Sequence, residues 1–124
     1  MSEKCSSACT AAQKLVFACS GAADVGAIAD QAARKLTREG AGKMFCLAGI
    51  GGRVSGIMKT TESAARILAI DGCSLDCAKS CLQQAGFAAF EHVRVIDLGM
   101  EKGSSPATEE RVALVADRAK AALA

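Results

Sequence analysis

Four short apolar runs, separated by stretches with helical spacing, constrain the fold of this chain most strongly. The runs cover residues 15–18, 43–48, 67–70 and 93–98, and a stretch with helical spacing precedes each run except the first. From Val25 onward, apolar residues recur at i+3, i+4, i+7, i+8 and i+11, the spacing of an amphipathic helix. Apolar strands that alternate with helices predict a parallel sheet, because the strands of such a sheet are buried on both faces.

The predicted fold class is therefore α/β: a small open parallel four-stranded sheet with helices on both faces, Rossmann-like or flavodoxin-like. The crossovers between its strands should be right-handed. A chain of 124 residues has the size of one domain. We expect residues 1–13, which carry Cys5 and Cys9, to form a flexible tail, and residues 14–124 to form a single α/β metal-binding domain.

The composition narrows the class of protein further. A net charge of +2, with no Trp or Tyr, argues against a nucleic-acid partner and against binding to an anionic membrane. The sequence has no apolar stretch of bilayer length and no apolar signal core after Met1, so we expect a cytoplasmic protein. Seven cysteines in such a chain indicate metal binding or thiol reactivity more than disulfides.

Three cysteines occupy corresponding positions, at or near the carboxyl ends of the first three predicted strands. Sites in open α/β sheets form outside this edge, and a strand order of 2-1-3-4 would make these three strands neighbours. A fourth cysteine lies in the first turn of the helix that follows strand three. Thiolates in this arrangement suit tetrahedral Zn²⁺. We call the four predicted zinc ligands the cysteine quartet: Cys19, Cys46, Cys73 and Cys77.

The chain resembles a small bacterial and archaeal family, the DGC domain, named after a triplet that stands here at residues 71–73. The stretches that carry the resemblance are residues 17–26, 44–52 and 70–78. The family is described as zinc-binding because of four potential chelating cysteines, which map onto the cysteine quartet. The resemblance implies that residues 14–124 are a DGC-type domain with a metal site, and it implies no particular reaction.

The remaining cysteines are assigned less sharply. Cys81 lies beside the apolar stripe of the helix after strand three, which begins at Leu75, and we interpret it as a packing thiol. The roles of Cys5 and Cys9 stay open. Cys73 is expected in the turn after strand three, while Cys19 and Cys77 are expected at helix N-termini, where a thiol loses its proton readily. Cys46 lies within an apolar run, where a core thiol is the competing interpretation.

Three polar residues near these cysteines have structural interpretations as well as functional ones. Asp71 could accept hydrogen bonds from the amides of the glycine turn, which is a structural role, or it could orient the thiolate ligands of a metal without binding the metal itself. The structural role is preferred. Asp24 is expected to cap the first helix. His92, the only histidine, starts the fourth strand, where a surface or core role outweighs a catalytic one.

The leading functional hypothesis is a zinc-binding domain whose metal ion is the one partner that the sequence indicates; a protein partner stays unknown. The alternative is an enzyme of persulfide or disulfide exchange that uses Cys73 or Cys19 as the attacking thiolate. An iron–sulfur protein is less favoured, because the spacing of Cys73, Cys77 and Cys81 is not a usual cluster spacing. A phosphatase of the tyrosine-phosphatase type is excluded, since Val25 stands where its anion-binding Arg would be.

Overall fold

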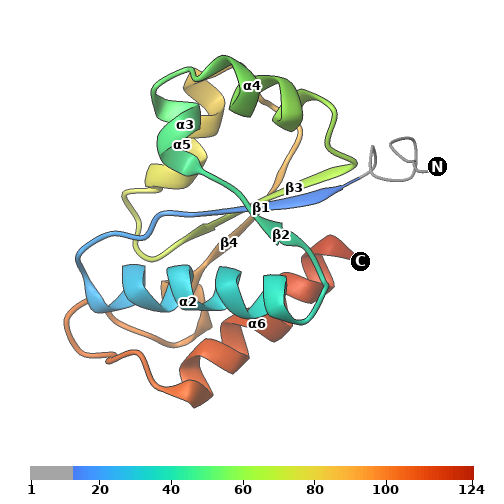
Figure 1. Ribbon diagram of the computed structural model, residues 1–124. Helices are drawn as coiled ribbons and strands as arrows, with labels where there is room; N and C mark the ends of the chain where they lie inside the picture. The colour runs from blue at the N-terminus through green and yellow to red at the C-terminus, as the bar shows by residue number, and fades with distance from the viewer. Residues whose placement is uncertain (1–12) are drawn as a thin grey trace.

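The computed structural model describes residues 13–124, which form one sheet between two layers of helices (Figure 1). Strands and helices alternate as the apolar runs predict. In chain order the elements are β1 (Lys14–Ala18), α2 (Asp24–Arg38), β2 (Lys43–Met44), α3 (Leu47–Gly51), α4 (Ser55–Glu62), β3 (Arg66–Asp71), α5 (Cys77–Gln84), β4 (Glu91–Arg94), the 3-10 helix η1 (Val95–Leu98) and α6 (Glu109–Leu123).

The sheet has four strands in the order β2-β1-β3-β4, and all three pairings are parallel. Leu15 on β1 stands opposite Lys43 on β2 and Ile67 on β3, which sets the register of the three strands. The predicted α/β fold with an open parallel sheet is therefore confirmed, and so is the 2-1-3-4 order. As a result, the carboxyl ends of β2, β1 and β3 lie side by side at one edge.

The two layers of helices bury opposite faces of the sheet. Helices α2 and α6 cover one face, and α3, α4 and α5 cover the other (Figure 1). Alternate residues of β1 serve the two layers: Val16 and Ala18 pack in the α2/α6 layer, whereas Leu15 and Phe17 pack in the α3–α5 layer. This double burial explains why β1 contains a continuous apolar run instead of alternating with polar residues.

The second apolar run forms less strand than the sequence predicts. Only Lys43–Met44 pairs as β2, and one further bond joins the Phe45 N–H to the Val16 carbonyl at 2.8 Å. The rest of the run enters the helix Leu47–Gly51, where Ile50 is fully buried. An apolar run of this length fits a buried strand and a buried helix equally well, so pattern alone could not separate them.

Two other boundaries differ from the prediction. The fourth strand begins at Glu91 and ends at Arg94, and the predicted continuation forms η1. Leu75 precedes α5 and is 68% exposed, so it is not part of the buried stripe that Ala78 and Leu82 form. The cause is Asp76, whose left-handed backbone (φ 55°) separates the turn from the helix.

The predicted tail at residues 1–13 lies outside the described residues apart from Gln13, and with it lie Cys5 and Cys9. Among the helices that the structure describes, none combines the length and the apolar character needed to cross a membrane.

Candidate functional site

The cysteine quartet lies along the carboxyl edge of the sheet. Cys19 directly follows β1, and Cys46 comes two residues after β2. Cys73 comes two residues after β3, and Cys77 is the first residue of α5. None of the five cysteines that the structure describes forms a disulfide. Topology therefore gathers these thiols at the edge where ligands bind in folds of this kind.

Cys19 has the most central position of these thiols, because β1 lies between β2 and β3. Its N–H donates to the Ile70 carbonyl at 3.1 Å, which extends the β1–β3 pairing past the end of β1. Its Sγ accepts a hydrogen bond from the Gly72 N–H at 3.3 Å. Cys19 does not lie at a helix N-terminus, contrary to the prediction, because α2 begins only at Asp24.

Gly72 lies where the turn after β3 meets the start of α2. A Cβ at Gly72 would stand 2.7 Å from the Val25 carbonyl carbon and 2.8 Å from the Gly26 nitrogen. Backbone atoms cannot yield in the way that a flexible side chain can, so only glycine fits this position. The close approach holds the turn that carries Cys73 against α2.

Cys46 is the N-cap residue of α3, and its Sγ accepts a hydrogen bond from the Gly49 N–H at 3.3 Å. Cys46 lies near the carboxyl end of the second strand, as predicted, and its exposure contradicts the competing interpretation as a core thiol. The cause is the early end of β2, which turns the chain out of the sheet at Phe45.

An open cavity of about 720 Å³ lies beside Cys19 at this edge. Three cysteines line it: Cys19, Cys46 and Cys81. Polar side chains line the same cavity, where Asp30 accepts hydrogen bonds from Ser20 Oγ at 2.7 Å and from Arg34 Nε at 2.8 Å. Cys81, which the helical pattern places beside the apolar stripe as a packing thiol, also lines this cavity together with two members of the quartet.

Cys73 faces a different environment. Its Sγ lies 3.9 Å from Lys102 Nζ, and the residue packs against the α2/α6 layer. The loop that carries Lys102 is held by Asp24, whose carboxylate accepts hydrogen bonds from the Gly103 and Ser105 N–H groups, both at 2.9 Å. These two bonds lower the pKa of Asp24. Asp24 is the first residue of α2 and not its N-cap, which is Ala23, although its carboxylate also accepts the Val25 N–H of the first turn at 2.8 Å.

Cys77 lies in the first turn of α5, as predicted, but its pKa is raised, contrary to the expectation that a thiol at this position loses its proton readily. The largest cause is burial of the sulfur, although the residue as a whole is exposed. Negative charge on neighbouring groups raises this pKa further, and these groups are Asp71, Cys19, Cys73 and Cys81. The sulfur of Cys77 therefore lies within electrostatic reach of thiols from both sides of the site.

Asp71 caps α5 from the end of β3. Its carboxylate is 1% exposed and accepts hydrogen bonds from the Ala78 N–H at 2.7 Å and the Lys79 N–H at 3.1 Å. These are amides of the first helical turn, which need an acceptor outside the helix. The preference for a structural role agrees with this arrangement, with the correction that the bonded amides belong to the helix and not to the glycine turn.

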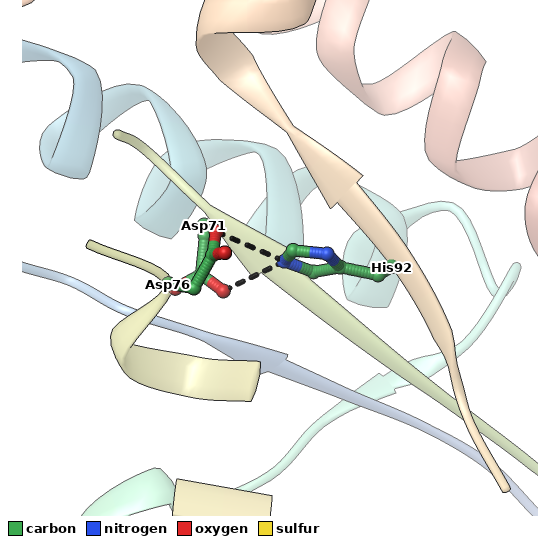
Figure 2. A group of neighbouring side chains, drawn as sticks. All are labelled: Asp71, Asp76 and His92. Carbon is green, nitrogen blue, oxygen red and sulfur yellow. Dashed lines mark hydrogen bonds and ion pairs between the residues drawn. The ribbon is translucent and has the colours of Figure 1, made fainter. Parts of the chain in front are cut away.

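Two residues of β4, His92 and Arg94, contact the two aspartates on either side of this turn. His92 Nε2 lies 2.8 Å from Asp71 Oδ2 and 3.7 Å from Asp76 Oδ1 (Figure 2). Arg94 donates two hydrogen bonds to Asp76, at 2.8 and 2.6 Å, and thereby lowers the pKa of that carboxyl group. His92 and Arg94 are two apart on β4, so both reach the same face of the sheet. His92 therefore has a defined structural partner, which its position at a strand start did not indicate.

Within residues 13–124, Asp71, Asp76 and His92 are the group of potential ligands whose ligand atoms all lie within 4.8 Å of one another. Their atoms already bond helix amides and Arg94, so a cation there would have to replace these partners. No three of the described cysteines have sulfurs that all lie within 4.8 Å of one another. The quartet fits zinc by the chemistry of its donor atoms, and its side chains would have to turn toward a shared centre.

Comparison with known proteins agrees with the resemblance seen in the sequence. The pattern of the DGC domain family matches residues 15–119. Over 88 residues the chain is 38% identical to the Anaerobic and virulence modulator AnvM of Pseudomonas aeruginosa, and this match covers 71% of the chain and 67% of that protein. No solved structure matches the chain. Because the family pattern spans well over half of its length, the chain belongs to the DGC domain family.

Proposed function

We propose that this domain binds one zinc ion through the cysteine quartet. The position of Cys19 carries the proposal. Its sulfur accepts the N–H of Gly72, the residue before Cys73, and lines one cavity with Cys46. Thiols from three neighbouring strand ends thus share one edge of the sheet, and their side chains would turn toward a common centre to bind zinc. The proposal requires thiols that stay reduced, as they do in the cytoplasm.

A closed set of four thiolates would favour a structural or sensing role. Zinc with four sulfur ligands has no open position for water, so hydrolysis is not supported. The ligands come from the ends of β1 and β3, from the start of α3 and from the start of α5. A metal held there would link the two layers of helices. The relative AnvM is named a modulator, and a metal site that reports on thiol chemistry would suit such a role here.

Thiol exchange at Cys73 is a second candidate function, and one observation favours it. Lys102 places an ammonium group 3.9 Å from Cys73 Sγ. A cation at this distance stabilises a thiolate, the form that attacks disulfides and persulfides. In this alternative, Cys73 would be the attacking sulfur and a neighbouring cysteine would resolve the mixed disulfide.

Zinc content tests the first proposal. Protein purified under reducing conditions should carry about one zinc per chain by elemental analysis. Cys19→Ser, Cys46→Ser and Cys77→Ser should each weaken zinc binding by at least about tenfold in a chelator competition, because each removes one thiolate ligand. Cys5→Ser, outside the quartet, is the matched control and should bind as the wild type does. Protein without zinc, or equal losses in the control, would contradict the proposal.

A further inference from the structure

Cys81 has the position of a ligand and not only that of a packing thiol. It lines the cavity of about 720 Å³ together with Cys19 and Cys46. It also lies four residues after Cys77 in α5, and side chains at this spacing share one face of a helix. The backbone of α3 approaches it closely, since a Cβ at Gly51 would stand 4.0 Å from Cys81 Sγ. Cys81 thus shares the cavity with Cys19 and Cys46, and a face of α5 with Cys77.

Cys73, by contrast, lies on the other side of the site. It packs against the α2/α6 layer, whereas Cys81 packs against the α3–α5 layer, and Cys19 contacts both layers. The ammonium of Lys102 beside Cys73 would repel a metal ion placed on that sulfur. Of the five cysteines within residues 13–124, Cys73 is therefore the one whose sulfur lies beside a cation that would repel a metal.

We propose that Cys81 is an exchange ligand of the zinc site, which can take the coordination position of Cys73. The site would then have two overlapping sets of four sulfurs. Both contain Cys19, Cys46 and Cys77, and the fourth sulfur is either Cys73 or Cys81. This inference rests on the proposed zinc binding, because it assigns a further ligand to the same metal.

The proposed exchange of Cys73 for Cys81 as a zinc ligand needs no oxidant or reductant. The bond from Cys81 Sγ to zinc forms as the Cys81 thiol gives its proton to water, and the bond from Cys73 Sγ to zinc breaks. The Cys73 thiolate then lies beside the Lys102 ammonium and takes a proton from water. Zinc keeps its charge and its four sulfurs throughout. Exchange would expose one thiol, Cys73, while the metal stays bound.

A double-mutant cycle tests this assignment. We expect Cys73→Ser and Cys81→Ser each to keep zinc, with affinity lowered less than about tenfold, because the other sulfur fills the position. The double variant should lose about tenfold or more beyond the product of the two single losses. The matched control is Cys73→Ser combined with Cys5→Ser, which should bind like Cys73→Ser alone. Multiplicative losses in the cycle would overturn the exchange and leave the proposed zinc binding intact.

A labelling experiment keeps the proposal testable if the double variant does not fold. In the Cys73→Ser protein loaded with zinc, Cys81 should react with iodoacetamide more slowly than in the zinc-loaded wild type, since it is then a permanent ligand. Substitution with cobalt(II) should preserve the thiolate-to-cobalt charge-transfer band of the wild type. An unchanged labelling rate at Cys81, or a band weakened by one thiolate, would overturn the proposal. A wild type that binds neither metal would instead refute the proposed function itself.

Discussion

Each residue of the triplet at positions 71–73 has a separate physical task. Asp71 supplies a buried acceptor to two helix amides, Gly72 permits backbone contact with α2, and Cys73 presents a sulfur to Lys102. The third task concerns the chemistry of a thiol, and the Gly72 N–H also donates to the Cys19 sulfur. The other two fix the turn from which that thiol projects.

The contact at Gly72 gives a prediction at the scale of one residue. Gly72→Ala should lower the free energy of unfolding by about 1–3 kcal/mol, because the added methyl group would overlap the backbone of α2. Gly56→Ala is the matched control: its Cβ would meet nothing within 4 Å, and Gly56 lies in α4. This control should leave stability unchanged or raise it by up to about 1 kcal/mol, since alanine favours helix. Urea unfolding curves measure both, and equal effects would contradict the assignment.

Among the elements, α2 contacts the turn after β3, the loop of Lys102 and α6. Its first turn receives Gly72, its Asp24 anchors the loop of Lys102, and its last turn is tied to α6. The tie is Glu39, whose carboxylate pairs with Lys120 of α6 and with Lys35 of its own helix. The position of Lys102 beside Cys73 therefore depends on how α2 and α6 are joined at both ends.

The Glu39 tie predicts a pH-dependent stability. Hydrogen bonds from Lys120 and then Lys35 lower the pKa of Glu39 from its ordinary 4.5 to about 2. The ionised carboxylate therefore stabilises the fold fully above pH 4.5, and this contribution disappears as the pH falls from 4.5 toward 2. Glu39→Gln should unfold at lower urea than the wild type at pH 7, and the gap should narrow below pH 4.5 and in high salt. Glu62→Gln, an exposed change in α4, is the control; a gap that does not change with pH would contradict the prediction.

At the scale of the whole molecule, some features can be predicted from the sequence and others cannot. The apolar runs around Val16 and Leu68 predict a parallel sheet because they need burial on both faces, whereas right-handed crossovers limit the possible strand orders without selecting one. The contacts of Lys102 with Cys73 and of His92 with Asp71 join positions 29 and 21 residues apart in sequence. No local periodicity reports such a contact, because loop packing decides it.

The candidate site also combines a feature that the sequence predicts with one that it does not. The edge that gathers the quartet follows from topology, so sequence alone could predict it. The cavity with Cys81 could not be predicted, because it depends on the early end of β2 and on the turn into α3. An apolar run has no feature that marks where a strand stops and a buried helix begins.

Removal of the metal should affect the whole molecule. If zinc binds the quartet, a chelator should lower the melting temperature by several degrees, since binding energy of the native state is also folding energy. The same treatment should speed iodoacetamide labelling of Cys19, Cys46 and Cys77, which mass spectrometry can map. A melting temperature that the chelator leaves unchanged, together with fast labelling of Cys73, would favour thiol exchange instead. Lys102→Gln should then slow that labelling, with Lys59→Gln on α4 as the control.

The hydrogen bond from the Gly72 N–H to Cys19 Sγ couples the Cys19 sulfur to the turn that carries Cys73. The Cys19 sulfur accepts this amide directly, so protonation, oxidation or metal binding at the sulfur would each change the strength of the hydrogen bond. The backbone of the turn therefore registers the chemical state of a side chain on a different strand. In NMR spectra, the chemical shift of the Gly72 amide should therefore report the chemical state of the Cys19 thiol without an added label, even where the rest of the chain does not move.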